Sequence, residues 1–472
     1  MSPPPPDQTT ASLSDGSTAS QRGAAIEVVR TLRDRGHVAY FAGGCVRDEL
    51  LGLTPADYDI ATDATPDRIK AIFPKSQEVG ASFGVMLVRA RAPHAAQASP
   101  ATSIEVATFR SDGVYSDRRR PDHVTFSDPR ADAERRDFTI NAMFLDPLEA
   151  PTPVPTASGS AQGKIIDFVG GLADLARGVV RAVGVADQRL AEDHLRSLRA
   201  VRFAARLGFQ IEESTAAAIR RHATELKGIS RERIGDELRR ALLHPTRAHA
   251  ARLLAELALD SPVLGETGCT SSRCPDLSSP AGGPALFSIL AGLDAWSQRT
   301  KFPVHFATAL AAWAIDLGIA SPSQATELAA RWRGALCLSN DEHHMLHKLV
   351  ATHQDVLHHW HDWPIAKRKR ALAQEWMAQA LMLCGAQESA RGEALWQDRA
   401  RLAASASGLA PPPLLTGDDL IAAGYRAGPR FRTVLEGVYD AQLEGRVGDR
   451  EQALELARRL GVERSTPPGS PS

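Results

Sequence analysis

The sequence predicts an α+β head with a mixed sheet and helices, followed by an all-α neck, body and tail. Two observations lead to this fold class. Up to about residue 187, short apolar runs of strand type lie between turns rich in glycine and proline. Beyond this point, apolar residues recur at helical spacing almost to the end of the chain.

A chain of 472 residues is too long for one compact core, and changes in composition divide it further. The first twenty or so residues are rich in proline, serine and threonine, which is typical of disorder. A second irregular stretch, rich in proline, glycine and serine, runs from Ser261 to Ala285. The predicted segments are a disordered N-terminus (1–21), a head (22–187), a helical neck (188–260), a helical body (261–408) and a helical tail (409–472).

The overall composition is that of an ordinary globular protein, with 43% hydrophobic and 24% charged residues. The net charge of −1 neither supports nor excludes a nucleic-acid partner. Five scattered cysteines fit a reducing compartment better than a disulfide framework. Because the chain has neither a run of about eighteen apolar residues nor a secretory signal pattern, we expect a cytoplasmic protein without a membrane segment.

The stretch Phe41-Ala-Gly-Gly-Cys-Val-Arg-Asp48 has the pattern of a phosphate cradle. An apolar strand enters a turn at Gly43 and Gly44, where backbone N–H groups can approach an anion closely. A short helix is predicted from Val46, and its positive N-terminal end would lie beneath the same anion. Arg47 adds a planar guanidinium that suits phosphate oxygens.

Asp57 and Asp59 lie in a predicted strand, Asp57 to Ala61. Residues i and i+2 of a strand face the same side, so both carboxylates are expected to point together. Two adjacent carboxylates repel each other and suit Mg²⁺, which binds through one or two carboxylates plus substrate phosphates. A phosphate cradle beside such a pair indicates nucleotidyl transfer assisted by metal ions. Taken separately, each half would also fit an ordinary glycine turn and a solvated Asp-x-Asp loop.

These residues carry a resemblance. Gly43-Gly-Cys-Val-Arg-Asp48 with Asp57-Tyr-Asp-Ile-Ala-Thr-Asp-Ala-Thr-Pro66 resembles the head-domain signature of the class II tRNA nucleotidyltransferase and poly(A) polymerase family. Members of that family add nucleotides to RNA 3′ ends without a template. The resemblance implies a nucleotidyltransferase head that uses Mg²⁺.

Glu105 lies on a predicted strand and alternates with the apolar Ile104 and Val106. A solvated sheet face would explain it. The family has a similar Ile-Glu-Val-x-Thr-Phe-Arg sequence here, and a third carboxylate facing the Asp57 and Asp59 pair would complete a catalytic palm. Whether Glu105 touches metal stays open.

Arg135-Arg-Asp-Phe-Thr-Ile-Asn141 matches the second motif of the family. The resemblance implies that Arg136 contacts the triphosphate or ribose. Asp137 and Asn141 would face one way on a helix, four residues apart, and hold the ribose or the arginines. A plain helix N-terminus with Asp137 as its cap would also explain the pattern.

Leu190 to Phe209 is predicted as one amphipathic helix with an apolar stripe and, beside it, an arginine stripe. Because no acid alternates with these arginines, we expect an anionic partner rather than a solvated face. Glu192-Asp-His-Leu-Arg within this helix also resembles the nucleobase-selecting motif of the family, in which an Asp and an Arg read the base. The arginine stripe comprises Arg196, Arg199, Arg202 and Arg206.

Together, the patterns and the resemblance assign the site residues. Catalysis is assigned to Asp57, Asp59 and Glu105, with Asp57 and Asp59 as the metal ligands. Nucleotide binding is assigned to Gly43, Gly44, Arg47, Asp48, Arg136, Asp137, Asn141, Asp193, Arg196, Arg199 and Arg202.

The body and tail carry weaker signals. The histidines His343, His344, His347, His358, His359 and His361 lack acidic partners at ligand spacing, so an exposed cluster is favoured over a metal site. Some relatives carry a phosphohydrolase His-Asp pair, but this chain has Ile315-Asp316 there, and we do not expect that activity.

The tail is predicted as two helices around a Gly-Pro corner at Gly428, with arginines that suit RNA backbone.

The leading functional expectation is addition of CCA to the 3′ end of tRNA from CTP and ATP. Poly(A) addition, or addition of only CC or only A, uses the same chemistry with a different stopping rule. A catalytically silent RNA-binding module is the alternative from another class, and the intact Asp57 and Asp59 pair argues against it.

Overall fold

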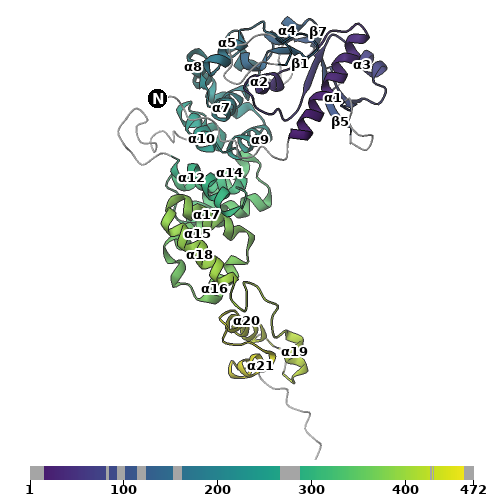
Figure 1. The fold of residues 1–472 in the computed structure, drawn as a ribbon. Coiled ribbons are helices and arrows are strands. Elements are labelled where there is room, and N and C mark those ends of the chain that lie inside the picture. The colour runs from purple at the N-terminus through teal and green to yellow at the C-terminus, as the bar shows by residue number, and fades with distance from the viewer. Residues whose placement is uncertain are drawn as a thin grey trace, which may run out of the picture. The chain divides into compact units, whose positions relative to one another are not determined.

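The computed structural model describes residues 15–80, 84–92, 101–113, 124–151, 162–265, 287–425, 428 and 430–461 (Figure 1). The chain divides into two compact units. The first comprises Met1–Leu238 with Leu253–Val263, and the second comprises Arg239–Arg252 with Leu264–Ser472. The predicted head and most of the predicted neck therefore lie in one unit.

The first unit is built on a mixed seven-stranded sheet in the order β3-β4-β5-β2-β1-β8-β9. Only β2 and β5 pair in parallel, and the other neighbours are antiparallel. The mixed sheet predicted for the head is confirmed. Its strands are β1 (Ala39–Ala42), β2 (Asp59–Thr62), β3 (Gln77–Gly80), β4 (Val85–Ala90), β5 (Thr102–Thr108), β8 (Phe144–Asp146) and β9 (Lys164–Ile166).

The central strands β1, β2 and β8 are buried along most of their length, whereas β5 alternates. In β5, Ile104 and Val106 are buried, whereas Ser103 before them and Glu105 between them are exposed. Helix α1 (Asp15–Asp34) packs on strands β1, β2, β4 and β5. Aromatic rings that include Phe109 and Phe144 fill a second cluster beside the sheet.

The remaining elements of the first unit surround the sheet and continue into the predicted neck. Two small sheets accompany them, β6 (Arg110–Asp112) with β7 (Val124–Phe126) and β10 (Val179–Val180) with β11 (Gln210–Ile211). The helices are α2 (Gly44–Leu50), α3 (Pro66–Ile72), α4 (Pro129–Glu134), η2 (Thr139–Asn141), α5 (Gly171–Arg177), α6 (Ala186–Glu192), α7 (Arg196–Leu207), α8 (Glu213–His222), η3 (Ala223–Gly228), α9 (Arg231–Leu242), which runs on into the second unit, and α11 (Asp260–Leu264).

The N-terminal segment differs from the prediction. Disorder was expected up to residue 21, but α1 already begins at Asp15. Arg22 in this helix forms an ion pair with Glu49 of α2, with 2.8 Å between Nε and Oε1. This contact and the buried Val28, Val29 and Leu32 anchor the helix to the head. Residues 1–14 lie outside the described part of the chain.

The second unit is all-helical in its described residues, as predicted for the body and tail. Buried tryptophans occupy its core, with Trp313 and Trp332 at 6.1 Å between ring centroids. The helices are α10 (Arg247–Glu256), which is shared with the first unit, α12 (Ser288–Thr300), α13 (Phe306–Asp316), α14 (Pro322–Leu336), α15 (Asn340–His359), η5 (Trp360–Asp362), α16 (Ile365–Leu372), α17 (Glu375–Gln387), α18 (Ser389–Ala403), α19 (Gly417–Ala422), α20 (Arg430–Leu443) and α21 (Arg450–Arg459).

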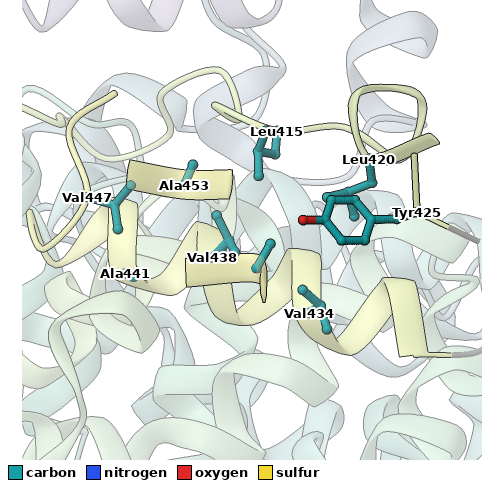
Figure 2. Packing of buried hydrophobic residues seen from close by; sticks show 9 residues of the cluster. Leu415, Leu420, Tyr425, Val434, Val438, Ala441, Val447 and Ala453 are labelled. Atoms are coloured by element: carbon teal, nitrogen blue, oxygen red, sulfur yellow. The ribbon is translucent and has the colours of Figure 1, made fainter. Parts of the chain in front are cut away.

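The helix predicted after the Gly-Pro corner is present as α20, whereas α21 was not predicted. The last three helices share an apolar cluster, in which Leu420, Tyr425, Val434, Val438 and Ala453 are buried (Figure 2). The tail helices therefore have a core of their own.

Residues 365–387 form two helices in place of one. The chain forms α16 and α17 with a break at Gln374, whose backbone is extended. The break lets the two helices face different neighbours. Lys369 of α16 donates to Ser405 and Ser407, while α17 packs on α12.

The histidines of the segment from His343 to His361 lie within α15 and η5. His344, His358, His359 and His361 are exposed as expected, whereas His343 and His347 are half-buried. Asp316, where relatives carry the phosphohydrolase pair, accepts hydrogen bonds from the backbone N–H groups of Ile289 and Leu290 at the start of α12. In the described part of the chain, none of the helices has the length and apolar character needed to cross a membrane.

Candidate active site

The turn after β1 requires glycine at its first position. Gly43 has φ 77° and ψ −126°, a conformation that side-chain-bearing residues rarely adopt. A Cβ atom on Gly43 would lie 2.9 Å from Nη1 of Arg136. Helix α2 begins at Gly44, directly after this turn, so the predicted strand, turn and helix are present.

Three carboxylates gather beside this turn. Asp59 and Glu105 are register partners on the parallel strands β2 and β5, so their side chains project from the same face of the sheet. Asp57 is exposed and lies near enough to Asp59 to repel its charge. The strand was predicted to begin at Asp57, but β2 begins at Asp59, and Asp57 lies in the preceding loop.

The electrostatics of Asp59 fit a cation site. Burial, followed by repulsion from Asp57 and Glu105, raises the pKa of Asp59 to about 7, although Arg136 opposes this shift. A divalent cation would remove the repulsion, and carboxylate oxygens are the donors that Mg²⁺ prefers. The described residues contain no group of three or more His, Cys, Asp or Glu side chains arranged as a ready-made metal site. Mg²⁺ also binds through one or two carboxylates together with substrate phosphates, and Asp57 and Asp59 could supply such a pair.

The second motif folds differently from the prediction. Helix α4 ends at Glu134, and the chain then forms only the short 3₁₀ turn η2 instead of a helix from Asp137 to Asn141. The two side chains nevertheless meet, because Nδ2 of Asn141 donates to Oδ1 of Asp137 at 3.2 Å.

Arg136 links this motif to the carboxylates. It donates to the buried Asp132 at 2.9 Å and to the backbone carbonyl of Asn141 at 3.2 Å. Its charge also lowers the pKa of Asp59 against the effect of burial. Asp132 was not predicted as a site residue. Asp132 lies on α4, four residues before Arg136, and this i, i+4 spacing of an acid and an arginine was the sequence signal for their ion pair.

Arg47 lies inside the protein rather than at an open phosphate position. Its side chain is buried, and it donates to Oδ1 of Asp48 at 2.6 and 2.8 Å and to Oδ1 of Asn141 at 2.5 Å. The guanidinium also stacks on Phe203 of α7. In this structure, Arg47, Asp48 and Asn141 join α2, η2 and α7 to one another. These bonds use three of the five N–H donors of Arg47, and its phosphate contact stays a prediction.

The predicted long neck helix is interrupted inside the base-selecting motif. Helix α6 ends at Glu192, Asp193 has an extended backbone, and α7 begins at Arg196. Oδ1 of Asp193 accepts from the backbone N–H of Leu195 at 3.1 Å. Asp193 is thus held at the break itself, and Arg196 opens the next helix.

The arginine stripe of α7 is neutralised by acids from other elements. Oδ2 of Asp137 accepts from Arg199 at 2.7 and 2.8 Å. Burial would raise the pKa of Asp137, but the charge and hydrogen bonds of Arg199 lower it to about 2. The other ion pairs are Arg196 with Glu192, Arg202 with Glu237, and Arg206 with Asp48. The argument that this stripe needs an external anion was wrong, because the acids come from other parts of the fold.

These contacts gather the predicted residues of the first unit around one site. The glycine turn follows β1, and Asp59 and Glu105 lie on β2 and β5, which are the neighbouring central strands of the sheet, with Arg136 close to the turn and to Asp59. The charge of Arg196 helps to lower the pKa of Asp137, and the charge of Asp193 helps to raise the pKa of Arg199. The stretch from Glu192 to Arg196 therefore lies beside the second motif.

Comparisons with known proteins agree with this arrangement. Residues 39–181 match the family described as the poly A polymerase head domain, and residues 208–267 match a probable RNA and SrmB-binding site of polymerase A. The CCA-adding enzyme of Geobacillus thermodenitrificans is 42% identical over 247 residues, which are 52% of this chain and 55% of that protein. The CCA-adding enzyme of Anoxybacillus flavithermus is 38% identical over 60% of this chain and 64% of its own length. The matches thus span between about half and two thirds of these curated relatives.

The likeness in fold extends further along the chain. The crystal structure of the Bacillus stearothermophilus CCA-adding enzyme in complex with CTP has a TM-score of 0.71 at 27% identity, covering 92% of this chain and 96% of that one. The Thermotoga maritima CCA-adding enzyme complexed with tRNA has a TM-score of 0.61 at 21% identity, which shows a common fold. Together with the glycine turn and the carboxylates on one face of the sheet, these matches show that residues 39–181 form a head domain of the poly A polymerase type, followed by a segment similar to the RNA-binding region of polymerase A.

Proposed function

We propose that this protein adds CCA to the 3′ end of tRNA, using CTP and ATP and releasing pyrophosphate. The observation that carries the proposal is the position of Asp59 and Glu105 side by side on one face of the sheet, near the Gly43 turn, with Asp57 close to Asp59. The similarity to CCA-adding enzymes supports the choice of reaction within the family. The site of action proposed with it is the cytoplasm.

Each part of the site has a task in this reaction. Asp57 and Asp59 would hold Mg²⁺, which when bound favours ionisation of the RNA 3′-hydroxyl and offsets charge on the triphosphate. The backbone of Gly43 and Gly44 would bind the phosphates at the N-terminus of α2. Arg136, fixed by Asp132, would face the triphosphate and stabilise the charge that develops during in-line displacement. Glu105 would complete the acidic face.

Base choice would come from Asp193 and Arg196. Cytosine and adenine both present an exocyclic amino donor beside a ring-nitrogen acceptor, whereas uracil and guanine present the reverse. A carboxylate accepts and a guanidinium donates, so this pair complements C or A. A site built on such complementarity can reject the wrong base by a factor on the order of 10⁴.

The direct test is incubation of the purified full-length protein with tRNA that lacks its terminal CCA. We expect two additions with CTP alone and a third only when ATP is also present. Long tails with ATP alone would indicate a poly(A) polymerase, and a stop after CC or after a single A would indicate a partial activity. No addition under any condition would leave the RNA-binding module as the function.

Asp57→Ala and Asp59→Ala test the carboxylate assignment in the same assay. The expected loss is about a thousandfold or more, because the ligands support several kcal/mol of transition-state stabilisation. Asp67→Ala removes an exposed carboxylate from α3 and serves as the matched control. A normal rate for either variant at saturating Mg²⁺ would contradict the assignment.

A further inference from the structure

The carboxylate of Asp193 is held in place by a residue outside its own motif. Its Oδ2 atom accepts from Nη2 of Arg233 at 2.6 Å, while its Oδ1 atom accepts from the backbone N–H of Leu195. Arg233 lies on α9, forty positions further along the chain. Both side chains are mostly buried, with 14% of Asp193 and 21% of Arg233 exposed. The two bonds fix both carboxylate oxygens.

Arg196 has a separate holder. Its Nη1 atom donates to Glu192 and to the backbone carbonyl of Arg189 at 2.7 Å. The acid and the cation assigned to base reading are therefore oriented independently. A carboxylate has about four lone-pair sites, so Asp193 can still accept from a base amino group after making these two bonds.

We propose that Arg233 is a positioning residue for base selection, acting by holding the Asp193 carboxylate in the orientation that accepts from the amino group of C or A. The inference rests on the proposed function, because it assigns base reading to Asp193. Without Arg233, the Asp193 side chain keeps only the Leu195 bond and can rotate. A rotating carboxylate no longer faces the carbonyl of U or G in one fixed place, so rejection of these bases weakens.

Helix α9 does not depend on Arg233 for its own position. Ile234 and Leu238 are buried, and Glu237 of the same helix pairs with Arg202 of α7. Removal of the Arg233 guanidinium should therefore release Asp193 without displacing the helix. This separation makes the role of Arg233 testable.

The experiment compares three variants of the full-length protein. Arg233→Met keeps the length of the side chain and removes its charge. Arg233→Lys keeps one charged donor, which suffices for the single bond to Oδ2. Arg231→Met is the matched control, because Arg231 lies two residues earlier on α9 and donates to the Pro262 carbonyl at 2.8 Å instead. Thermal unfolding checks that each variant folds.

The main readout is equilibrium binding of CTP, ATP, UTP and GTP without RNA, and incorporation into tRNA lacking CCA is measured alongside. The ratio of Kd for UTP to that for CTP should fall by about tenfold or more in Arg233→Met. The ratio should recover in Arg233→Lys and stay unchanged in Arg231→Met.

An equal weakening for all four nucleotides in Arg233→Met would overturn the positioning role, as would failure of Arg233→Lys to recover the preference. Equal binding of all four nucleotides to the unmodified protein would also overturn it, whatever the incorporation assay gives. Because binding needs no RNA acceptor, a protein that prefers C and A but adds nothing to tRNA would contradict the proposed function and leave the role of Arg233 supported.

Discussion

The Asp137–Arg199 ion pair should make a large, measurable contribution to the stability of the first unit. We consider the replacements Asp137→Asn and Arg199→Met, alone and together. Asp137 is 9% exposed and accepts from Arg199, Asn141 and the backbone N–H of Phe138. Asn at this position keeps an acceptor but turns an NH₂ group toward the guanidinium.

The magnitude follows from the pKa of Asp137, which is lowered from 3.8 to about 2. At 1.36 kcal/mol per pKa unit, this shift corresponds to about 2 kcal/mol of stability for the ionised form. Because the folded pKa lies below the unfolded one, this stability is present above pH about 4 and is lost as the pH falls toward 2. Arg199→Met should cost more, about 3 to 5 kcal/mol, because it leaves a buried carboxylate without its cation.

The assay can separate the two units. All seven tryptophans lie in the second unit, between Trp296 and Trp396, so tryptophan fluorescence follows that unit alone while circular dichroism follows both. In urea at pH 7, each single variant should shift the dichroism transition and leave the fluorescence transition in place. The double variant should lose less than the sum of the singles, with a coupling energy of about 2 kcal/mol. A coupling below about 0.5 kcal/mol would refute the reasoning, since the pair would then act as independent surface charges.

Two further predictions concern the second unit. Gly385→Ala should lower its stability by about 1 to 3 kcal/mol, because the added Cβ would lie 2.3 Å from the Trp296 ring, whereas Gly334→Ala, with no atom within 4 Å, should be neutral or stabilising. An unchanged fluorescence transition for Gly385→Ala would show that the α12–α17 contact relaxes freely. Truncation after Leu409 should weaken tRNA binding and reduce its salt dependence while CTP and ATP binding persist, because tail arginines such as Arg430 and Arg432 would lose their phosphate contacts. Equal tRNA affinity of the truncated protein would make the tail purely structural.

The parts of the site that depend on local chain geometry were predictable from the sequence. The turn at Gly43 needs a positive φ, which glycine supplies, and the strand that carries Asp59 has the apolar pattern of a buried strand. The strand predicted around Glu105 is present as β5, and its parallel register with β2 puts Glu105 on the same face of the sheet as Asp59. In each case the residue types constrain the backbone within a few positions.

The parts that depend on distant partners were not predictable. Arg47 has the chemistry of a phosphate ligand, but a residue 94 positions away, Asn141, decides what it binds in this structure. The break at Asp193 interrupts a continuous helical pattern because the side chain bonds Leu195 on one side and Arg233 on the other. Neither Leu195 nor Arg233 changes the helical spacing of apolar residues around Asp193, so the sequence pattern does not reveal the break.

The arginine stripe of α7 leads to a more specific expectation for phosphate binding. Its four arginines already pair with Glu192, Asp137, Glu237 and Asp48, so no external anion is needed to offset their repulsion. The pairs differ in exposure. The side chains of Arg196 and Arg202 are only 10% and 13% exposed, whereas those of Arg199 and Arg206 are 34% and 35% exposed. Since an arginine has five N–H donors, Arg199 and Arg206 can keep their carboxylates and still donate to phosphate from the exposed side. Contact with nucleotide or RNA phosphate along α7 is therefore expected of these two residues, and Arg202 is expected to act by holding α7 against α9.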